Sequence, residues 1–180
     1  MSLTQNAHTL ITAHFSNKPK RIGIDATCGN GHDTEFLCRL GFDQVTGFDV
    51  QAQAISASEQ RIQEAGLKAD FIHTGHENMQ QHIQNEFDCV MFNFGYLPKA
   101  DKQLTTQSET SLQAINTALN KLSATGLISL MCYPGHPAGA VETSNIKAHL
   151  QTLSRDWHVE THLAKSPKPT APILFLVSRK

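Results

Sequence analysis

Short apolar runs alternate along this chain with longer stretches in which apolar residues recur at helical spacing. Such an alternation predicts an α/β fold, in which helices connect the strands of a largely parallel sheet. The sequence predicts seven strands, at residues 21–26, 44–48, 69–74, 88–94, 127–133, 159–163 and 173–178. It predicts helices at residues 33–40, 52–65, 77–84, 109–122 and 140–153.

The connection between the last two predicted strands differs from the others. It contains the proline-rich string Ser166 to Pro172 and is too short to hold a crossover helix. These two strands are therefore expected to pair as an antiparallel hairpin. The expected fold is a doubly wound, mostly parallel, seven-stranded Rossmann-like sheet with this hairpin at its C-terminal end.

Composition limits the classes of protein that fit. The 180 residues suit one domain, and 15 Lys and Arg residues against 16 Asp and Glu residues give a net charge of −1. That balance excludes a strongly basic nucleic-acid coat protein but leaves a local basic patch possible. The residues up to Phe15 lack the basic and then apolar order of a signal peptide. We expect a single cytoplasmic domain over residues 1–180, with residues 1–18 as an N-terminal arm.

A glycine-containing loop, from Asp25 to Thr34, follows the first predicted strand and opens the first helix. Ligands of open α/β sheets bind at this position, outside the carboxyl ends of the strands. Gly29 and Gly31 permit a close approach of the backbone to a ligand. Thr34 stands where a G-x-G-x-x-G loop has its third glycine, which disfavours NAD. The alternative is a tight turn that needs glycine for its geometry alone.

Two later residues add to this pattern. Asp49 ends the second predicted strand, 18 residues after Gly31, and an acid at about that spacing accepts hydrogen bonds from ribose hydroxyls. The alternative role for Asp49 is a helix N-cap. His76 follows the third strand and would lie beside the same crevice, although by itself it is more simply a partly exposed loop residue. Together these residues point to a cofactor that contains a nucleoside.

Two loops at the same expected end of the sheet carry further candidates. Asn93 lies at the end of an apolar strand, where a polar side chain needs a partner, and Phe94 and Tyr96 offer stacking surfaces. A simple turn is the alternative. His136 lies in a turn made rigid by two prolines and a glycine. The sequence thus predicts an active site at this edge.

The strings DATCGNGHDT, GFDV, HENM, MFNFGYLPKADK and YPGHPAG resemble those of small class I S-adenosylmethionine-dependent methyltransferases of the rRNA methylase (YtqB-like) family. The resemblance extends from about His8 to Val177. It implies the doubly wound methyltransferase fold and S-adenosylmethionine as the cofactor. It also implies methylation of the aminomethyl group of the tRNA wobble uridine, which forms 5-methylaminomethyl-2-thiouridine.

The resemblance also implies roles for individual residues. The methionine part of the cofactor would be surrounded by Asp25, Thr27, Gly29, Asn30, Gly31, His32 and Asp33. Asp49 would hold the ribose, and His76 would lie near the adenine. The active-site loop would be formed by Asn93, Gly95 and Tyr96, and His136 matches the G-H-P turn. No metal is expected.

The expected reaction is in-line transfer of the sulfonium methyl group to an amine nitrogen of an RNA nucleoside. Asn93 or the neighbouring carbonyls would accept hydrogen bonds from the amine, and Tyr96 or Phe94 would stack on the base. His136 is the first candidate to take the released proton, and His76 is the second. The expected partner is RNA, at the tRNA anticodon region, and not a membrane. Because the net charge is near zero, we expect a homodimer that assembles a basic groove from two weak patches.

Four other functions are the alternatives. The neutral charge favours a methyltransferase that acts on a small molecule, and the family resemblance leaves rRNA open as the substrate. An NAD-dependent oxidoreductase is disfavoured by the missing third glycine and by the terminal antiparallel strand. A regulatory module that binds S-adenosylmethionine without catalysis would not need the N-F-G-Y-L-P and P-G-H-P loops.

Overall fold

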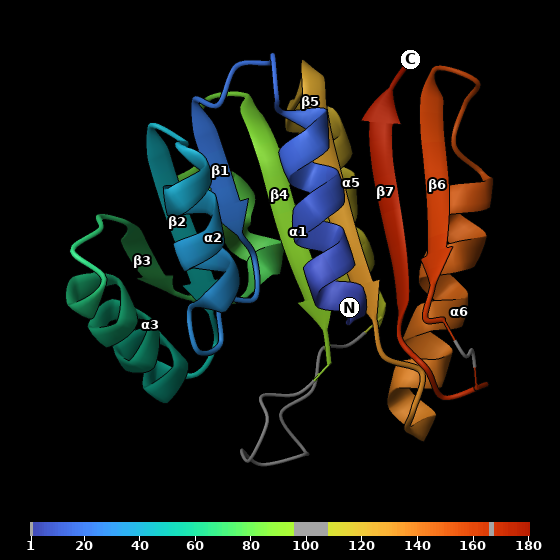
Figure 1. The fold of residues 1–180 in the computed structure, drawn as a ribbon. Helices are drawn as coiled ribbons and strands as arrows, with labels where there is room; N and C mark the ends of the chain where they lie inside the picture. Colours follow the sequence, from blue (N-terminus) through green and yellow to red (C-terminus); the bar gives the residue numbers. More distant parts are fainter. Residues whose placement is uncertain (1, 96–107, 166–167) are drawn as a thin grey trace.

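The computed structural model describes residues 2–95, 108–165 and 168–180. Its strands are β1 (Ile22–Asp25), β2 (Gln44–Asp49), β3 (Asp70–His73), β4 (Phe87–Phe94), β5 (Leu122–Cys132), β6 (Trp157–Leu163) and β7 (Ile173–Arg179). Its helices are α1 (Leu3–His14), α2 (His32–Leu40), α3 (Ala52–Glu64), the 3-10 helix η1 (His76–Asn78), α4 (Met79–His82), α5 (Ser108–Lys121) and α6 (Pro137–Gln151). Within the described ranges these strands form one seven-stranded sheet in the order β3-β2-β1-β4-β5-β7-β6 (Figure 1).

The first five strands run parallel to one another. β7 lies between β5 and β6 and is antiparallel to both. The predicted fold class, including the terminal hairpin, is therefore confirmed. Strand order reverses at β1 and β4, and in sheets of this kind a crevice for ligands opens where the order reverses.

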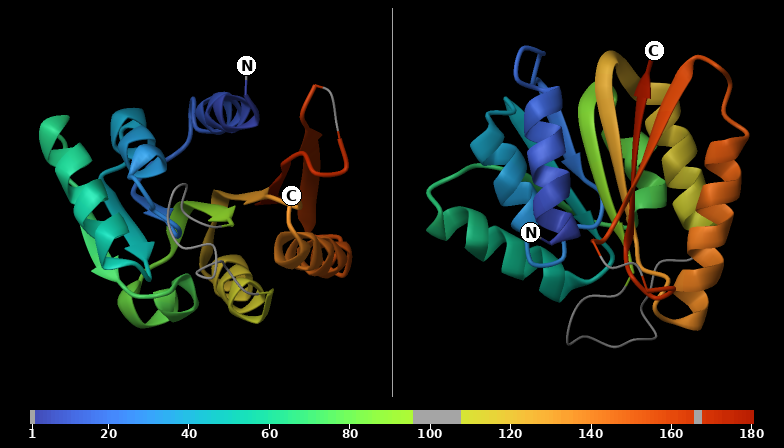
Figure 2. Two further views of the ribbon diagram at one scale, coloured as in Figure 1. Left: turned by 90° about the horizontal axis from the view of Figure 1, so that it is seen from below. Right: turned by 45° about the vertical axis from the view of Figure 1, so that its right-hand side comes forward.

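Helices cover both faces of the sheet. α1, α2 and α3 lie on one face, and α4, α5 and α6 lie on the other (Figure 2). The larger core lies under α5 and α6 and contains Phe92 and Phe94 of β4. The other face buries Ile11 and Phe15 of the N-terminal segment, and Leu37 of α2, against the sheet. Because β4 is covered on both faces, its sequence is apolar almost throughout.

The N-terminal segment is a regular helix, which the description of residues 1–18 as an arm missed. Ser2 and Gln5 form a capping box, in which each side chain binds the other residue's backbone. Ala7 and Ile11 are buried one turn apart, and Phe15 follows the helix. Polar residues between these positions obscure the apolar stripe in the sequence. α1 runs so that its N-terminus lies near the carboxyl ends of β4 and β5 (Figure 1).

Three predicted boundaries differ from the structure. β5 begins at Leu122 rather than at residue 127, because it starts directly after α5 and pairs there with Phe87 before the register shifts. α6 begins at Pro137 rather than at residue 140, since proline suits the first turn of a helix. The helix predicted at 77–84 is a short 3-10 turn followed by one turn of α-helix.

Arg21, whose side chain is 57% exposed, is anchored to a buried acid. Its guanidinium Nη2 lies 2.8 Å from Oδ1 of Asp88, and its backbone amide donates to Oδ2 at 2.8 Å. Ser123 donates a third hydrogen bond, at 2.7 Å, to the same carboxylate. Asp88 therefore ties the starts of β1, β4 and β5 together at the end of the sheet opposite the predicted site.

The four cysteines, Cys28, Cys38, Cys89 and Cys132, are free thiols. Among the described residues, no helix combines the length and apolar character that crossing a bilayer requires.

Candidate active site

The loop between β1 and α2 is shaped by two glycines in the left-handed region. Gly29 has φ 52° and Gly31 has φ 77°. A Cβ atom on Gly31 would lie 3.0 Å from the Cα atom of Ser58 in α3. Ser58 also donates a hydrogen bond of 3.1 Å to the Gly29 carbonyl. Part of the glycine requirement is therefore geometric, since a side chain at Gly31 would separate α3 from the loop.

Asp49 closes this loop from the neighbouring strand. One carboxylate oxygen accepts the Gly29 amide at 3.0 Å, and the other accepts the Gln51 amide at 2.9 Å. The alternative role as a helix N-cap is wrong, because the N-cap of α3 is Gln51. A carboxylate offers about four lone-pair sites, so each oxygen can still accept a bond from a ligand.

Val50, which follows Asp49, was not singled out from the sequence. Its side chain is 57% exposed, although most apolar residues of this size are buried. It thus places an apolar surface beside a half-buried carboxylate at the edge of the crevice. The available signal was an apolar residue directly after a strand-ending acid.

Asp25 is completely buried beneath the loop. Its carboxylate accepts hydrogen bonds from Thr34 Oγ1 at 2.7 Å and from the Thr27 amide at 3.4 Å. Burial, reinforced by the nearby negative charge of Asp33, raises its pKa to about 7. Asp25 therefore holds the loop in place from the protein interior.

This raised pKa predicts an unusual pH dependence of stability. Between its ordinary pKa near 3.8 and about 7, Asp25 keeps a proton in the folded state that the unfolded chain has released. The free energy of unfolding contributed by Asp25 therefore falls as pH rises through this window. In D25N, asparagine can accept from the Thr27 amide and donate to Thr34 without titrating. The wild-type stability relative to D25N should decline from pH 4 to pH 8 in denaturant titrations.

The comparison with D25N is needed because other groups change the free energy of unfolding with pH in the opposite direction. Burial lowers the pKa of His76, so His76 destabilises the fold as pH falls below its ordinary pKa. Subtracting the D25N curve removes that contribution. A difference between the two proteins that stays constant from pH 4 to pH 8 would contradict the assignment.

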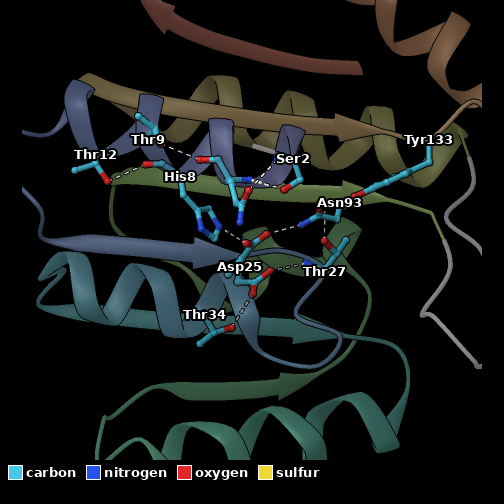
Figure 3. Close-up of polar contacts among 11 residues, drawn as sticks. Ser2, His8, Thr9, Thr12, Asp25, Thr27, Thr34, Asn93 and Tyr133 are labelled. Atoms are coloured by element: carbon cyan, nitrogen blue, oxygen red, sulfur yellow. Dashed lines mark hydrogen bonds and ion pairs between the residues drawn. The ribbon is translucent and has the colours of Figure 1, made fainter. Parts of the chain in front are cut away.

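Asp33 of α2 and Asn93 of β4 are joined by a hydrogen bond at the carboxyl end of β4. Asn93 lies near the end of β4, where its backbone amide donates to Thr27 Oγ1 at 2.7 Å and its side-chain Nδ2 donates to Asp33 Oδ2 at 2.5 Å (Figure 3). The Tyr133 hydroxyl approaches Asn93 Oδ1 at 3.4 Å. The polar residue at the end of an apolar strand thus has the partners that the sequence required of it.

Two residues of this cluster were not assigned from the sequence. His8 of α1 lies 2.6 Å from Asp33 through its Nε2 atom. Tyr133 directly precedes the P-G-H-P turn, and its hydroxyl faces Asn93 (Figure 3). Burial raises the pKa of the Tyr133 phenol, so it stays protonated and can donate. Neither contact has a local sequence signal, because each joins residues that are distant in the chain.

Asn30 and His32 lie away from this cluster. Both are exposed, and both contact Arg61 of α3, whose Nε donates to the backbone carbonyl of Asn30 at 2.6 Å. A nitrogen of the same guanidinium lies 3.3 Å from His32 Nε2. The structure thus places these two residues at the seam between α2 and α3, while Asp33, one residue later, points toward β4.

His76 is buried, in contrast to the partly exposed loop residue expected from its position. Its ring stands edge-on to Phe92 and Phe94. It lies beside the Ala26 carbonyl, and its Nε2 atom has no hydrogen-bond partner among the described residues. Burial keeps the ring neutral at physiological pH.

His136 caps helix α6. Its Nδ1 atom accepts the Gly139 amide at 3.1 Å. A Cβ on Gly139 would collide with the Tyr133 carbonyl, so glycine is required for this cap. Because Nδ1 accepts, the neutral ring carries its proton on Nε2 and offers no second lone pair. This geometry argues against His136 as the proton acceptor. Tyr96 lies outside the described residues.

Comparison with known proteins places this site in a family. Residues 45–178 match the model of the family described as "Putative rRNA methylase". The chain belongs to the rRNA methylase family. A structure titled "putative rRNA-methylase" from Clostridium thermocellum superposes with a TM-score of 0.93 at 31% identity, covering 100% of this chain and 98% of that one. A "putative methyltransferase" from Streptococcus mutans, in complex with SAH, has a TM-score of 0.85 at 28% identity, covering 96% and 97%.

Among curated relatives, a chloroplastic tRNA (mnm(5)s(2)U34)-methyltransferase from Arabidopsis thaliana is 31% identical over 172 residues. This alignment covers 87% of the chain but only 62% of the relative's length. Ribosomal RNA small subunit methyltransferase H from Clostridioides difficile is 27% identical over 53% of the chain and 34% of its own length. This rRNA methylase family member therefore has the Rossmann-like methyltransferase sheet over its whole described length.

Proposed function

We propose that this rRNA methylase family member is an S-adenosylmethionine-dependent methyltransferase acting on an amine nitrogen of an RNA nucleoside. The observation that carries the proposal is the fixed carboxamide of Asn93, at the carboxyl end of β4 and beside the glycine loop. The family, and the names of the tRNA and rRNA methyltransferases to which the chain is similar, support this class of reaction.

The residues around the glycine loop fit an adenosine-bearing cofactor. Asp49 retains one accepting site on each oxygen, which suits the two adjacent hydroxyls of a ribose. Val50 offers an exposed apolar surface for a base. Nearby, His76 Nε2 is a buried polar atom with no hydrogen-bond partner in the described part of the chain. Bound S-adenosylmethionine would supply an already activated methyl group on its sulfonium. The S. mutans neighbour with SAH supports this choice.

Asn93 would orient the acceptor amine. Its Nδ2 is committed to Asp33, so Oδ1 is the atom left to accept from a substrate. Tyr133 uses one lone pair of Oδ1 at a long 3.4 Å, and the second can accept an N–H of the amine. With one N–H held there, the nitrogen lone pair is free to attack. Alignment of this kind supplies much of the rate enhancement when the methyl donor is already activated.

Release of the proton from the amine does not require His136 as the acceptor. That ring is occupied by its helix cap, and His76 is buried and stays neutral. We therefore propose that the amine enters in its neutral form and that the methylated product releases its proton to water. Asn93 and Tyr133 then act by holding the nitrogen, without themselves gaining a charge.

We propose the wobble 5-aminomethyl-2-thiouridine of tRNA as the substrate, because a 31% identical relative bears that activity in its name. Methylation of rRNA is the second candidate, supported by the shorter match to a small-subunit rRNA methyltransferase. The test is to incubate the protein and S-adenosylmethionine with tRNA lacking the final methyl group, with rRNA and with small amines. Nucleoside mass spectrometry should show one added methyl group on the wobble uridine only. Methylation confined to rRNA or to small amines would refute the tRNA assignment.

We further propose that RNA binding uses a homodimer. Lys165 and Lys168 are exposed in the β6–β7 connection, at the same end of the sheet as Asn93. Two such pairs would make a stronger phosphate-binding surface than one, which a chain of net charge −1 needs. Light scattering at working concentration should give the mass of two chains, and a monomer mass would contradict this proposal.

A further inference from the structure

Helix α1 brings a histidine to the centre of the candidate site. His8 Nε2 lies 2.6 Å from Asp33 Oδ1, with the two side chains 26% and 8% exposed. An ionised carboxylate only accepts hydrogen bonds, so Nε2 is the donor. The contact joins residues 25 positions apart and connects α1 to the first turn of α2.

The orientation of His8 is fixed by a second contact. Its ring stacks on Phe36 with a centroid separation of 3.8 Å and an interplanar angle of 2°. Phe36 lies one turn after Asp33 on α2, so the same helix supplies both the stacking surface and the acceptor. The stack holds the ring in place, and the hydrogen bond then sets the position of the carboxylate.

The effect passes through Asp33 to Asn93. His8 donates to Oδ1 of Asp33, while Asn93 Nδ2 donates to Oδ2 of the same carboxylate. This bond determines which way the Asn93 carboxamide faces, with Oδ1 toward the Tyr133 hydroxyl. Without His8, the Asp33 carboxylate could rotate, and Asn93 would lose its fixed orientation.

We propose that His8 is a positioning residue of the reaction, acting through Asp33 to hold Asn93 Oδ1 toward the substrate amine. The inference rests on the proposed function, in which Asn93 accepts from that amine. It gives α1 a role in the reaction beyond packing, since the helix then carries the first residue of the hydrogen-bonded series His8–Asp33–Asn93. His8 itself needs no contact with the substrate or the cofactor.

Two substitutions separate this role from simple packing. H8F keeps a ring to stack on Phe36 but removes the donor. H8Q removes the ring but places a side-chain N–H at a reach similar to that of Nε2.

A positioning role predicts that H8F loses kcat about ten- to hundredfold, the cost of one hydrogen bond to a charged group. It also predicts that H8Q recovers most of that loss, while KM for tRNA and the Kd for S-adenosylhomocysteine change little in both. H158F, on the exposed face of β6, is the matched control.

A packing role predicts the reverse order of kcat, with the kcat of H8F near that of wild type and the kcat of H8Q reduced. That order, or an H8F enzyme with full kcat, would overturn the inference. The side-chain amide resonances of Asn93, assigned with N93A, give a second readout that needs no substrate. They should shift in H8F and return in H8Q, and unchanged resonances in H8F would overturn the inference too. If H8F does not fold, a kcat of H8Q far below wild type in a folded protein is the contradicting result.

Failure of the proposed function gives a different outcome. In that case the wild-type protein transfers no methyl group to any RNA, although the Asn93 resonances still report whether His8 positions the carboxamide. A wild-type enzyme that is active, together with a fully active H8F, leaves the proposed function standing and removes His8 from it.

Discussion

The N93A variant should lose methyl transfer by about 10²–10³-fold while still binding S-adenosylhomocysteine with nearly wild-type affinity. The expected loss is that of one preorganised polar group at the reacting atoms. Asn93 uses Nδ2 to bind Asp33 and leaves Oδ1 for the amine, so alanine removes the acceptor without touching the glycine loop. The measurement is kcat on tRNA that lacks the methyl group, together with a calorimetric Kd for S-adenosylhomocysteine.

The matched control for this prediction is N120A, an exposed position of α5 away from the crevice. It should behave as wild type in both measurements. N93D gives a further check, because it places a second carboxylate against Asp33 and should also be inactive. Normal turnover by a folded N93A protein would remove Asn93 from the mechanism.

The D49A variant should bind S-adenosylhomocysteine about a hundredfold more weakly than wild type. Asp49 is expected to act twice, by accepting the ribose hydroxyls and by holding the Gly29 amide at 3.0 Å. Hydrogen bonds to a charged acceptor contribute roughly 1.5–3 kcal/mol each, which is enough for a loss of this size. The measurement is the dissociation constant from calorimetric titration, with the melting midpoint recorded for each variant.

Two variants test the specificity of this effect. D70A removes an exposed carboxylate at the start of β3, the opposite end of the sheet from the crevice, and should not change the dissociation constant. D49N keeps an oxygen for the Gly29 amide but loses the charge, so its affinity should fall between wild type and D49A. Equal affinities for wild type and D49A would show that the cofactor binds elsewhere.

The parts of the site that were predicted from the sequence depend on local spacing. The glycine loop and Asp49 follow strands whose carboxyl ends must meet in a parallel sheet, so their proximity follows from the topology. The terminal hairpin was equally predictable, because its connection is too short for a helix. Asn93 was found because a polar residue at the end of a buried strand needs a partner.

The parts that were missed depend on tertiary contacts or on side-chain direction. His8 reaches Asp33 only because α1 packs against β5 and β7, which its interrupted apolar pattern did not reveal. His32 is close to Asp33 in sequence, yet its ring lies against Arg61, which also binds the backbone carbonyl of Asn30. His136 was placed at the correct edge of the sheet, but the use of its Nδ1 as a helix cap depends on the close approach of Gly139.

The most direct test of the account is calorimetric titration of the wild-type protein with S-adenosylmethionine, S-adenosylhomocysteine and NAD. The central claim is that the crevice beside Gly29 and Asp49 holds the first two compounds. Both should bind with micromolar affinity, at one site per chain, and NAD should not bind. Binding of NAD alone, or of none of the three, would contradict the claim.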